Sequence, residues 1–260
     1  MSLLDHGKSA ASETHPCLIF LSVLDPHPDA RFNIECYTDV PKGMQKPKPD
    51  LLMRHFSDLT LKGIVDLIPE LESLNSKGAG IFTTVNRCRG RRSKNNVIRV
   101  RAVHADVDAA SDQQREKLIR SLAPSIIVTS SEPTKLHLYW KLDDAAAKEK
   151  EAVSKINQLL ASDYGADNAA TDISRILRLP GFKHMKYRHL GQTPVVKAAY
   201  NNGIYSVEEV QAAFLITQPT PTQYQTRRKR DDALSKIEAK VMAEMKARCP
   251  QLWSGAWEDA

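Results

Sequence analysis

Cysteine is scarce in this sequence. The 260 residues include four cysteines, and no two of them form a Cys-x-x-Cys pair. Disulfide frameworks and structural zinc modules need more cysteines at closer spacings. We therefore expect a reduced protein of the cytoplasm that contains no zinc.

Long apolar runs are absent as well. The longest, residues 17–24, is much shorter than the ~20 residues of a membrane-spanning helix, and no basic stretch leads into it. Neither a membrane segment nor a secretory signal is expected. Glycine and proline together account for 11 + 14 = 25 residues, too few for a collagen-like or low-complexity chain.

Basic charge, by contrast, is plentiful and clustered. Lys and Arg outnumber Asp and Glu by 37 to 31, a net charge of +6, which favours a nucleic acid or another polyanion as partner. Residues 87–101 carry seven basic side chains and no acid, and further basic clusters span residues 183–189 and 227–230. We interpret the first two as a phosphate-facing rim, whereas a solvated surface explains the third equally well. The residues predicted to bind DNA are Arg87, Arg89, Arg91, Arg92, Lys183 and Lys186.

Hydrophobic periodicity predicts an α+β protein of one to two domains. Strands are predicted at residues 18–24, 33–38, 80–86, 97–108, 125–129, 135–141, 173–179 and 194–200. Capping and proline signals predict helices at residues 60–67, 69–78, 111–123, 145–162 and 206–214. The predicted domains are a flexible tail at 1–16, a main domain at 17–216, a polar linker at 217–226 and a helical extension at 227–260.

Two acids end the most β-branched of these segments. Asp106 and Asp108 are two residues apart, so in a strand both carboxylates point to one face, with Cα atoms ~6.8 Å apart. Such a pair suits two divalent cations in a phosphoryl-transfer site. The simpler alternative to metal binding is that the two acids lie where a strand enters a solvent-exposed loop.

Two later segments carry further polar side chains. Lys135 and His137 share one face of a predicted strand and could hold a triphosphate, although a structural core histidine remains an alternative. Asp172 precedes Arg175 and Arg178, which could give a metal ligand beside phosphate contacts or, equally, a salt-bridge network at the Pro180-Gly181 turn.

The three elements together resemble the archaeo-eukaryotic primase superfamily. Its signature is a pair of acids, then a small-x-His strand, then a lone acid, which this chain matches with Asp106 and Asp108, Lys135-Leu136-His137, and Asp172. Two segments look like the RepB-type primases of plasmids and other mobile elements: residues 81–86, which precede the basic residues 87–101, and Arg175-Ile-Leu-Arg178-Leu-Pro-Gly181. The resemblance covers roughly residues 80–186.

This resemblance implies a fold, a reaction and a set of roles. The fold would be an RRM-like catalytic sheet packed with an α/β unit, in a primase (nucleotidyltransferase) catalytic domain at 17–216 with a short C-terminal helical extension. The enzyme would make short primers on single-stranded DNA from nucleoside triphosphates with two Mg²⁺ or Mn²⁺ ions, and a helicase or other replication proteins could assist it. Asp106, Asp108 and Asp172 would be catalytic and hold the metals, and Lys135, His137 and Arg178 would bind the nucleotide. Arg175 would have a supporting role.

Two other functions stay open. A non-catalytic replication protein that binds single strands through its sheet would need stacking aromatics, yet aromatic residues make up only 6% of the chain. A rolling-circle initiator or relaxase would need a His-x-His metal site. Here Asp106 stands where a second histidine would have to follow His104.

Overall fold

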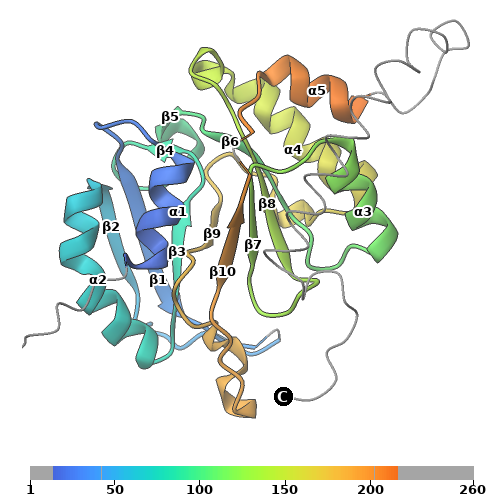
Figure 1. Ribbon diagram of the computed structural model, residues 1–260. Helices are drawn as coiled ribbons and strands as arrows, with labels where there is room; N and C mark the ends of the chain where they lie inside the picture. Colours follow the sequence, from blue (N-terminus) through green and yellow to red (C-terminus); the bar gives the residue numbers. More distant parts are fainter. Residues whose placement is uncertain (1–13, 42, 202, 216–260) are drawn as a thin grey trace, which may run out of the picture.

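Two four-stranded antiparallel sheets form the framework of the protein (Figure 1). The computed structural model describes residues 14–41, 43–201 and 203–215. The first sheet has the order β2-β1-β3-β9, made of Arg54–Leu59, Phe32–Thr38, Ala79–Thr84 and Ile176–Arg178. The second has the order β10-β7-β8-β6, made of Lys197–Tyr200, Ile126–Thr129, Leu136–Lys141 and Ala102–Asp106. A two-stranded ribbon pairs β4 (Arg87–Cys88) with β5 (Val97–Arg99).

Helices cover both sheets. The first sheet packs against α1 (Pro16–Leu24) and α2 (Leu61–Ser76), and this core continues to β8, where the Phe20 and Tyr139 rings meet edge to face at 5.6 Å. One face of the second sheet joins this core, and its opposite face packs against α3 (Asp112–Ser121), α4 (Lys150–Tyr164) and α5 (Val207–Leu215). Short 3₁₀ helices lie at Lys94–Asn96, Ala145–Lys148, Asn168–Ala170 and Met185–Leu190.

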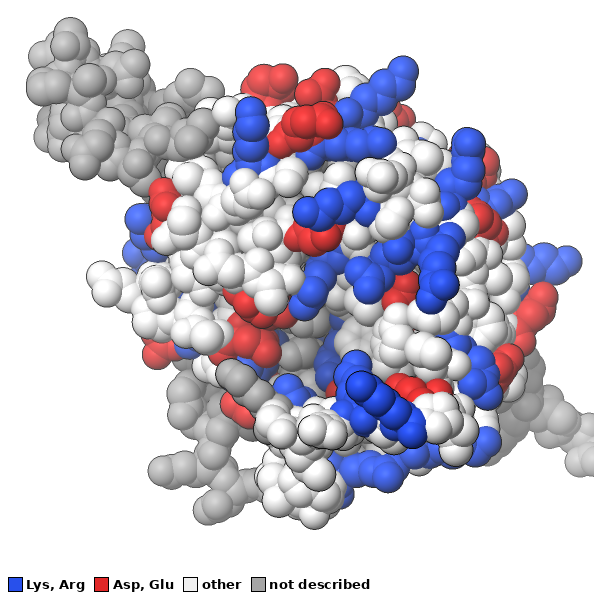
Figure 2. All heavy atoms as spheres, turned by 180° about the vertical axis from the view of Figure 1, so that it is seen from behind, with Lys and Arg blue, Asp and Glu red and all other residues white. Residues whose placement is uncertain are grey.

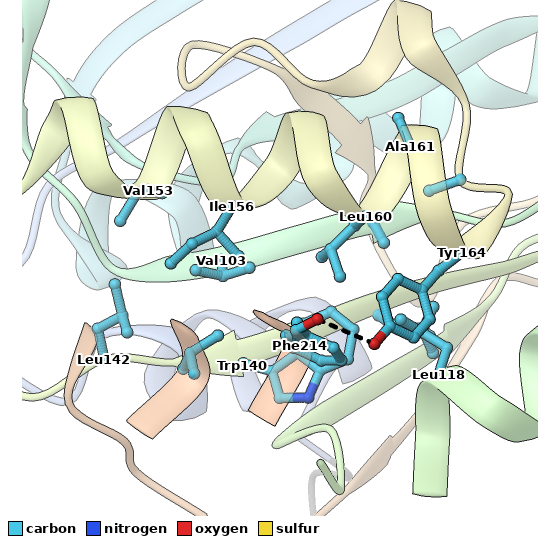
Figure 3. Close-up of a cluster of buried hydrophobic side chains, with 14 of the residues drawn as sticks. Val103, Leu118, Trp140, Leu142, Val153, Ile156, Leu160, Ala161, Tyr164 and Phe214 are labelled. Carbon is cyan, nitrogen blue, oxygen red and sulfur yellow. Dashed lines mark hydrogen bonds between the residues drawn. The ribbon is translucent and has the colours of Figure 1, made fainter. Parts of the chain in front are cut away.

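The core under the second sheet follows from strand alternation. In β8, Leu138 and Trp140 point to the helical side, while His137 and Tyr139 point to the other face. Figure 3 shows Trp140 among side chains of α4 and α5, and the Tyr164 hydroxyl donates to the Phe214 carbonyl at 3.1 Å. The second sheet thus has one face packed on the helices and an opposite face that joins the core of the first sheet and also carries His137.

Most of the predicted elements are confirmed, and four are corrected. Residues 18–24 form a helix instead of a strand, because Pro16 stands at its first turn and the His15 side chain caps it. The two helices predicted at 60–67 and 69–78 are one helix. Thr60 does cap it, and Pro69 lies inside at an exposed position where water can solvate the carbonyl that loses its helical partner.

The long strand predicted at 97–108 is also divided. It breaks after Arg99, so β5 belongs to the small ribbon and β6 to the second sheet. Asn86, just after β3, causes the break, because its side-chain oxygen accepts hydrogen bonds from the backbone N–H groups of Arg101 and Ala102 at 2.7 and 3.3 Å. Arg101 itself is buried, and its Nε donates to Asp25 at 2.6 Å. This contact joins the end of α1 to the start of β6.

Three capping predictions hold in detail. Ser111 forms a capping box with Gln114 at the start of α3, Ser206 forms one with Glu209 before α5, and Gly165 ends α4 in the left-handed conformation. None of the described helices is both long and apolar enough to cross a membrane. The predicted linker and helical extension lie outside the described residues.

Candidate active site

Two acids and a histidine meet at the end of the second sheet. Asp106 ends β6 and pairs with His137 of β8, and Asp108 follows two residues later. Asp106 Oδ1 and His137 Nδ1 are buried, and neither has a hydrogen-bond partner in the described structure. A buried polar atom without a partner costs ~1–3 kcal/mol, so a ligand that contacts both of these atoms would recover that free energy.

The electrostatics of the three groups agree with a site for a cation. Burial raises the pKa of the Asp106 carboxyl, and the negative charge of Asp167 raises it further. Burial also raises the pKa of Asp108, with Asp106 as the next cause. Burial lowers the pKa of His137 to about 4, so its ring is neutral at pH 7. A divalent cation would relieve the repulsion between the two carboxylates, and the donor set fits Mg²⁺ or Mn²⁺.

Basic side chains surround this group. Lys135 Nζ donates to the Asp108 carbonyl at 2.8 Å. Arg178 and Arg175 both act electrostatically on His137, in the direction that lowers its pKa. Arg175 Nε is buried without a partner, whereas Arg178 is engaged, since its Nη2 donates to Asp39 Oδ1 at 2.9 Å and its Nη1 lies 2.9 Å from Oδ2. The structure therefore brings together the three predicted segments.

The third acid predicted from the sequence, Asp172, is engaged in contacts outside the Asp106–His137 pair. Asp172 Oδ1 accepts hydrogen bonds from the backbone N–H and hydroxyl of Ser174 at 2.7 and 2.8 Å, and its Oδ2 lies 3.8 Å from Lys94 Nζ. Asp167, not singled out from the sequence, donates its backbone N–H to the Asp106 carbonyl at 2.7 Å. Its carboxylate is also the acid that acts most strongly on the pKa of Asp106. The sequence signal for Asp167 is its place two residues after Gly165, which turns the chain back at the end of α4.

A buried histidine holds the Asp167 segment in place. His104 Nε2 lies 2.9 Å from the Ala170 carbonyl, at the end of the 3₁₀ helix that Asp167 caps. The other ring nitrogen lies 3.3 Å from the Asn157 side chain of α4. Within the described residues, no three His, Cys, Asp or Glu side chains are grouped closely enough to hold a metal by themselves.

The basic residues predicted to bind DNA are in different environments. In the loop of residues 87–96, called the basic loop below, Arg89 and Arg91 are exposed. Arg92 Nε donates to the buried Glu35 at 3.2 Å, and Arg87 lies 3.6 Å from Asp29. Lys183 is exposed and Lys186 partly exposed. Figure 2 shows Lys and Arg side chains gathered around a hollow in the middle of the face seen from behind.

Comparison with known proteins assigns the chain to a family. The family model for the RepB DNA-primase N-terminal domain matches residues 75–218, more than half of the chain. The chain belongs to the RepB DNA-primase family. No curated protein matches the sequence significantly.

Three solved structures share the fold of this RepB-type domain. The catalytic domain of primase RepB′ in complex with initiator DNA is 21% identical, with a TM-score of 0.52 over 76% of this chain and 91% of that one. Primase RepB′ itself is also 21% identical, with a TM-score of 0.54 over 90% and 75%. The archaeo-eukaryotic primase domain of the cyanophage S-2L primase-polymerase is 17% identical, with a TM-score of 0.55 over 76% and 96%. The predicted archaeo-eukaryotic primase fold is thereby confirmed, and family membership supports a primase of DNA replication.

Proposed function

We propose that this chain is a primase that synthesises short primers on single-stranded DNA from nucleoside triphosphates, in the replication of a plasmid or another mobile element. The observation that carries the proposal is the pairing of Asp106 with His137 across β6 and β8, with one buried, unpartnered polar atom on each. Family membership and the likeness to a primase solved with initiator DNA support it.

Each side chain then has a distinct task. Asp106 and Asp108 would hold two Mg²⁺ or Mn²⁺ ions, which when bound neutralise the phosphates and activate the attacking hydroxyl. His137, neutral at pH 7, would donate a hydrogen bond to the triphosphate, and Lys135 would add a positive charge beside it. Nucleotide transfer then joins the 3′ oxygen to the α-phosphorus as the bond to pyrophosphate breaks.

We further propose that Asp167, in place of Asp172, supplies the third carboxylate. Asp167 is tied to the Asp106 carbonyl and acts on the Asp106 carboxyl. One of its carboxylate oxygens accepts from the Ala169 N–H at 2.9 Å, whereas both oxygens of Asp172 have other contacts. Arg178 is held by Asp39, and its positive charge acts on His137. We therefore assign it a positioning role beside the nucleotide.

The test is synthesis by the full chain with Mg²⁺ or Mn²⁺, labelled nucleotides and mixed single-stranded DNA. Asp106→Asn and Asp167→Asn should each lower the rate more than tenfold, ~1.4 kcal/mol of barrier. Asp172→Asn, the matched control, should stay within about threefold, because an amide oxygen can still accept from Ser174. Mn²⁺ affinity, measured by electron paramagnetic resonance, should fall in the first two variants alone.

The outcomes separate the alternatives. New short products support a primase, extension of supplied primers alone means a polymerase, and no products with intact DNA binding mean the non-catalytic binding protein. If Asp172→Asn loses activity and metal affinity while Asp167→Asn keeps both, the assignment made from the sequence is the right one.

A further inference from the structure

Two aromatic rings lie side by side on the face of the first sheet that α1 and α2 do not cover. Alternation along β1 sends Ile34 and Cys36 into the core and leaves Tyr37 on the opposite face. Phe82 of β3 lies next to it, with ring centroids 6.4 Å apart and planes inclined by 54°. Both side chains are partly exposed. Partly exposed rings on a sheet face that no helix covers are available for contact with a partner.

A glycine allows the Phe82 ring to lie along its strand. Tyr37 stands opposite Gly80 in the sheet register. A Cβ atom on Gly80 would come within 2.8 Å of Phe82 Cε2, closer than real contacts allow. The space for this ring orientation therefore exists because residue 80 has no side chain.

Cations flank both rings. Lys46 Nζ lies 4.9 Å from the Tyr37 ring centroid, and the Arg178 guanidinium lies 4.9 Å from that of Phe82, both within the range of cation–π attraction. Arg92 is bound to Glu35, and its charge acts on the Tyr37 hydroxyl in the direction that lowers its pKa. The Arg92 side chain is 34% exposed and that of Glu35 is 5% exposed, so the positive partner faces the solvent.

The basic loop is fastened to the same face. Asn33, on the same side of β1 as Tyr37, donates to the Gly90 carbonyl at 2.7 Å, and Asp58 accepts the Gly90 N–H at 2.8 Å. These contacts fasten the loop that carries the exposed Arg89 and Arg91 to the sheet face that carries the rings. Exposed arginines and partly exposed rings on one face are the combination that binds a single strand, with phosphates on the cations and bases on the rings.

We infer that Tyr37 and Phe82 form a stacking platform for unpaired bases of the single-stranded DNA template. The inference rests on the proposed function, since it takes the strand to be the template of primer synthesis. The platform lies between the basic loop and Arg178, whose charge reaches His137. A strand that enters along the basic loop would therefore pass over the rings on its way to the catalytic acids.

The test compares ordinary and abasic DNA on the full chain. Wild-type protein should bind a thymidine oligonucleotide about 5- to 100-fold more tightly than an abasic strand of equal length, as base–aromatic stacking predicts. Tyr37→Leu and Phe82→Leu should each reduce this preference and leave affinity for the abasic strand within about twofold. Tyr37→Phe, which keeps the ring, is the matched control and should retain it. The salt dependence of binding should not change, because no phosphate contact is removed.

A second measurement reports on base stacking directly. The fluorescence of 2-aminopurine within the strand should be quenched when wild-type protein binds, and less so with Phe82→Leu. Equal affinity of the wild type for both strands, or an equal loss on both strands in the leucine variants, would overturn the platform. A raised nucleotide requirement with unchanged DNA affinity would overturn it too, because the rings would then serve the incoming nucleotide. Asp106→Asn, which tests the primase proposal, should leave the base preference intact, so the two can fail separately.

Discussion

The arginines of the basic loop lead to a quantitative prediction about salt. Arg89 and Arg91 are exposed and make no ion pair within the described residues, whereas Arg87 lies near Asp29 and Arg92 is bound to Glu35. We therefore expect Arg89 and Arg91, and not the whole cluster, to contact phosphates. Each phosphate contact on a single strand contributes ~0.7 to the slope of log affinity against log salt concentration.

The double variant Arg89→Gln/Arg91→Gln should make this slope shallower by about 1.4. Between 50 and 200 mM salt, wild-type affinity should thus fall about sevenfold more than that of the variant. Fluorescence anisotropy with a labelled oligonucleotide over a salt series measures both numbers. The matched control is Lys62→Gln/Lys155→Gln, which removes two exposed positive charges from α2 and α4. An unchanged slope in the arginine variant, or an equal change in the lysine control, would show that these arginines are solvated and that the path lies elsewhere, with Lys183 and Lys186 the next candidates.

Three further predictions concern buried groups. His137→Ala should raise the nucleotide concentration needed for synthesis at least tenfold, since a charge-assisted hydrogen bond is worth ~1.5–3 kcal/mol, and leave DNA affinity within about twofold; a protein that simply unfolds would mean a structural histidine. Arg101→Met should lower the free energy of unfolding by ~3–5 kcal/mol, because it removes the guanidinium that contacts the buried Asp25 carboxylate at 2.6 Å; Asp25→Asn in the same background should recover part of the loss in urea titrations. His104 has its pKa lowered to about 4 by burial, so stability should be complete above pH ~6.5 and decline as the pH falls towards 4. A His104→Gln variant, less stable at pH 7.5, should lose less than the wild type between pH 7.5 and 5 in the same titrations.

Local signals in the sequence predicted much of this fold. Ser111 and Ser206 mark helix starts through hydrogen bonds to residues only three positions later in the sequence. The strands β7 and β8 follow from uninterrupted apolar or alternating patterns. The predictions failed where the deciding contact is distant. The break after Arg99 depends on Asn86 and Asp25, and no pattern within residues 97–108 contains them.

The same division applies to the candidate site. Asp106 and His137 could be placed at a strand end and within a strand because alternation along a strand is a local property, whereas their pairing across β6 and β8 is seen only in the fold, and Asp108 lies just beyond the end of β6. Asp167 and Asp172 are both acids in one polar stretch, and only the return of the chain at Gly165 brings one of them to Asp106. The pair of Tyr37 and Phe82 could not be predicted from the sequence for a similar reason. Tyr37 and Phe82 are isolated in the sequence and become neighbours only through the pairing of β1 with β3.

The contact between Asp25 and Arg101 also bears on where the smallest autonomous folding unit begins. The family match starts at residue 75, inside α2, but β3 lies in the first sheet beside β1, and Arg101 is neutralised by Asp25 at the end of α1. A fragment cut at residue 75 would lose β1 and β2, expose the apolar side of β3 and leave a buried guanidinium without its carboxylate. The range matched by the family model is thus shorter than the range needed to complete the first sheet and the buried ion pair. The segment before residue 75 is part of the same folded unit.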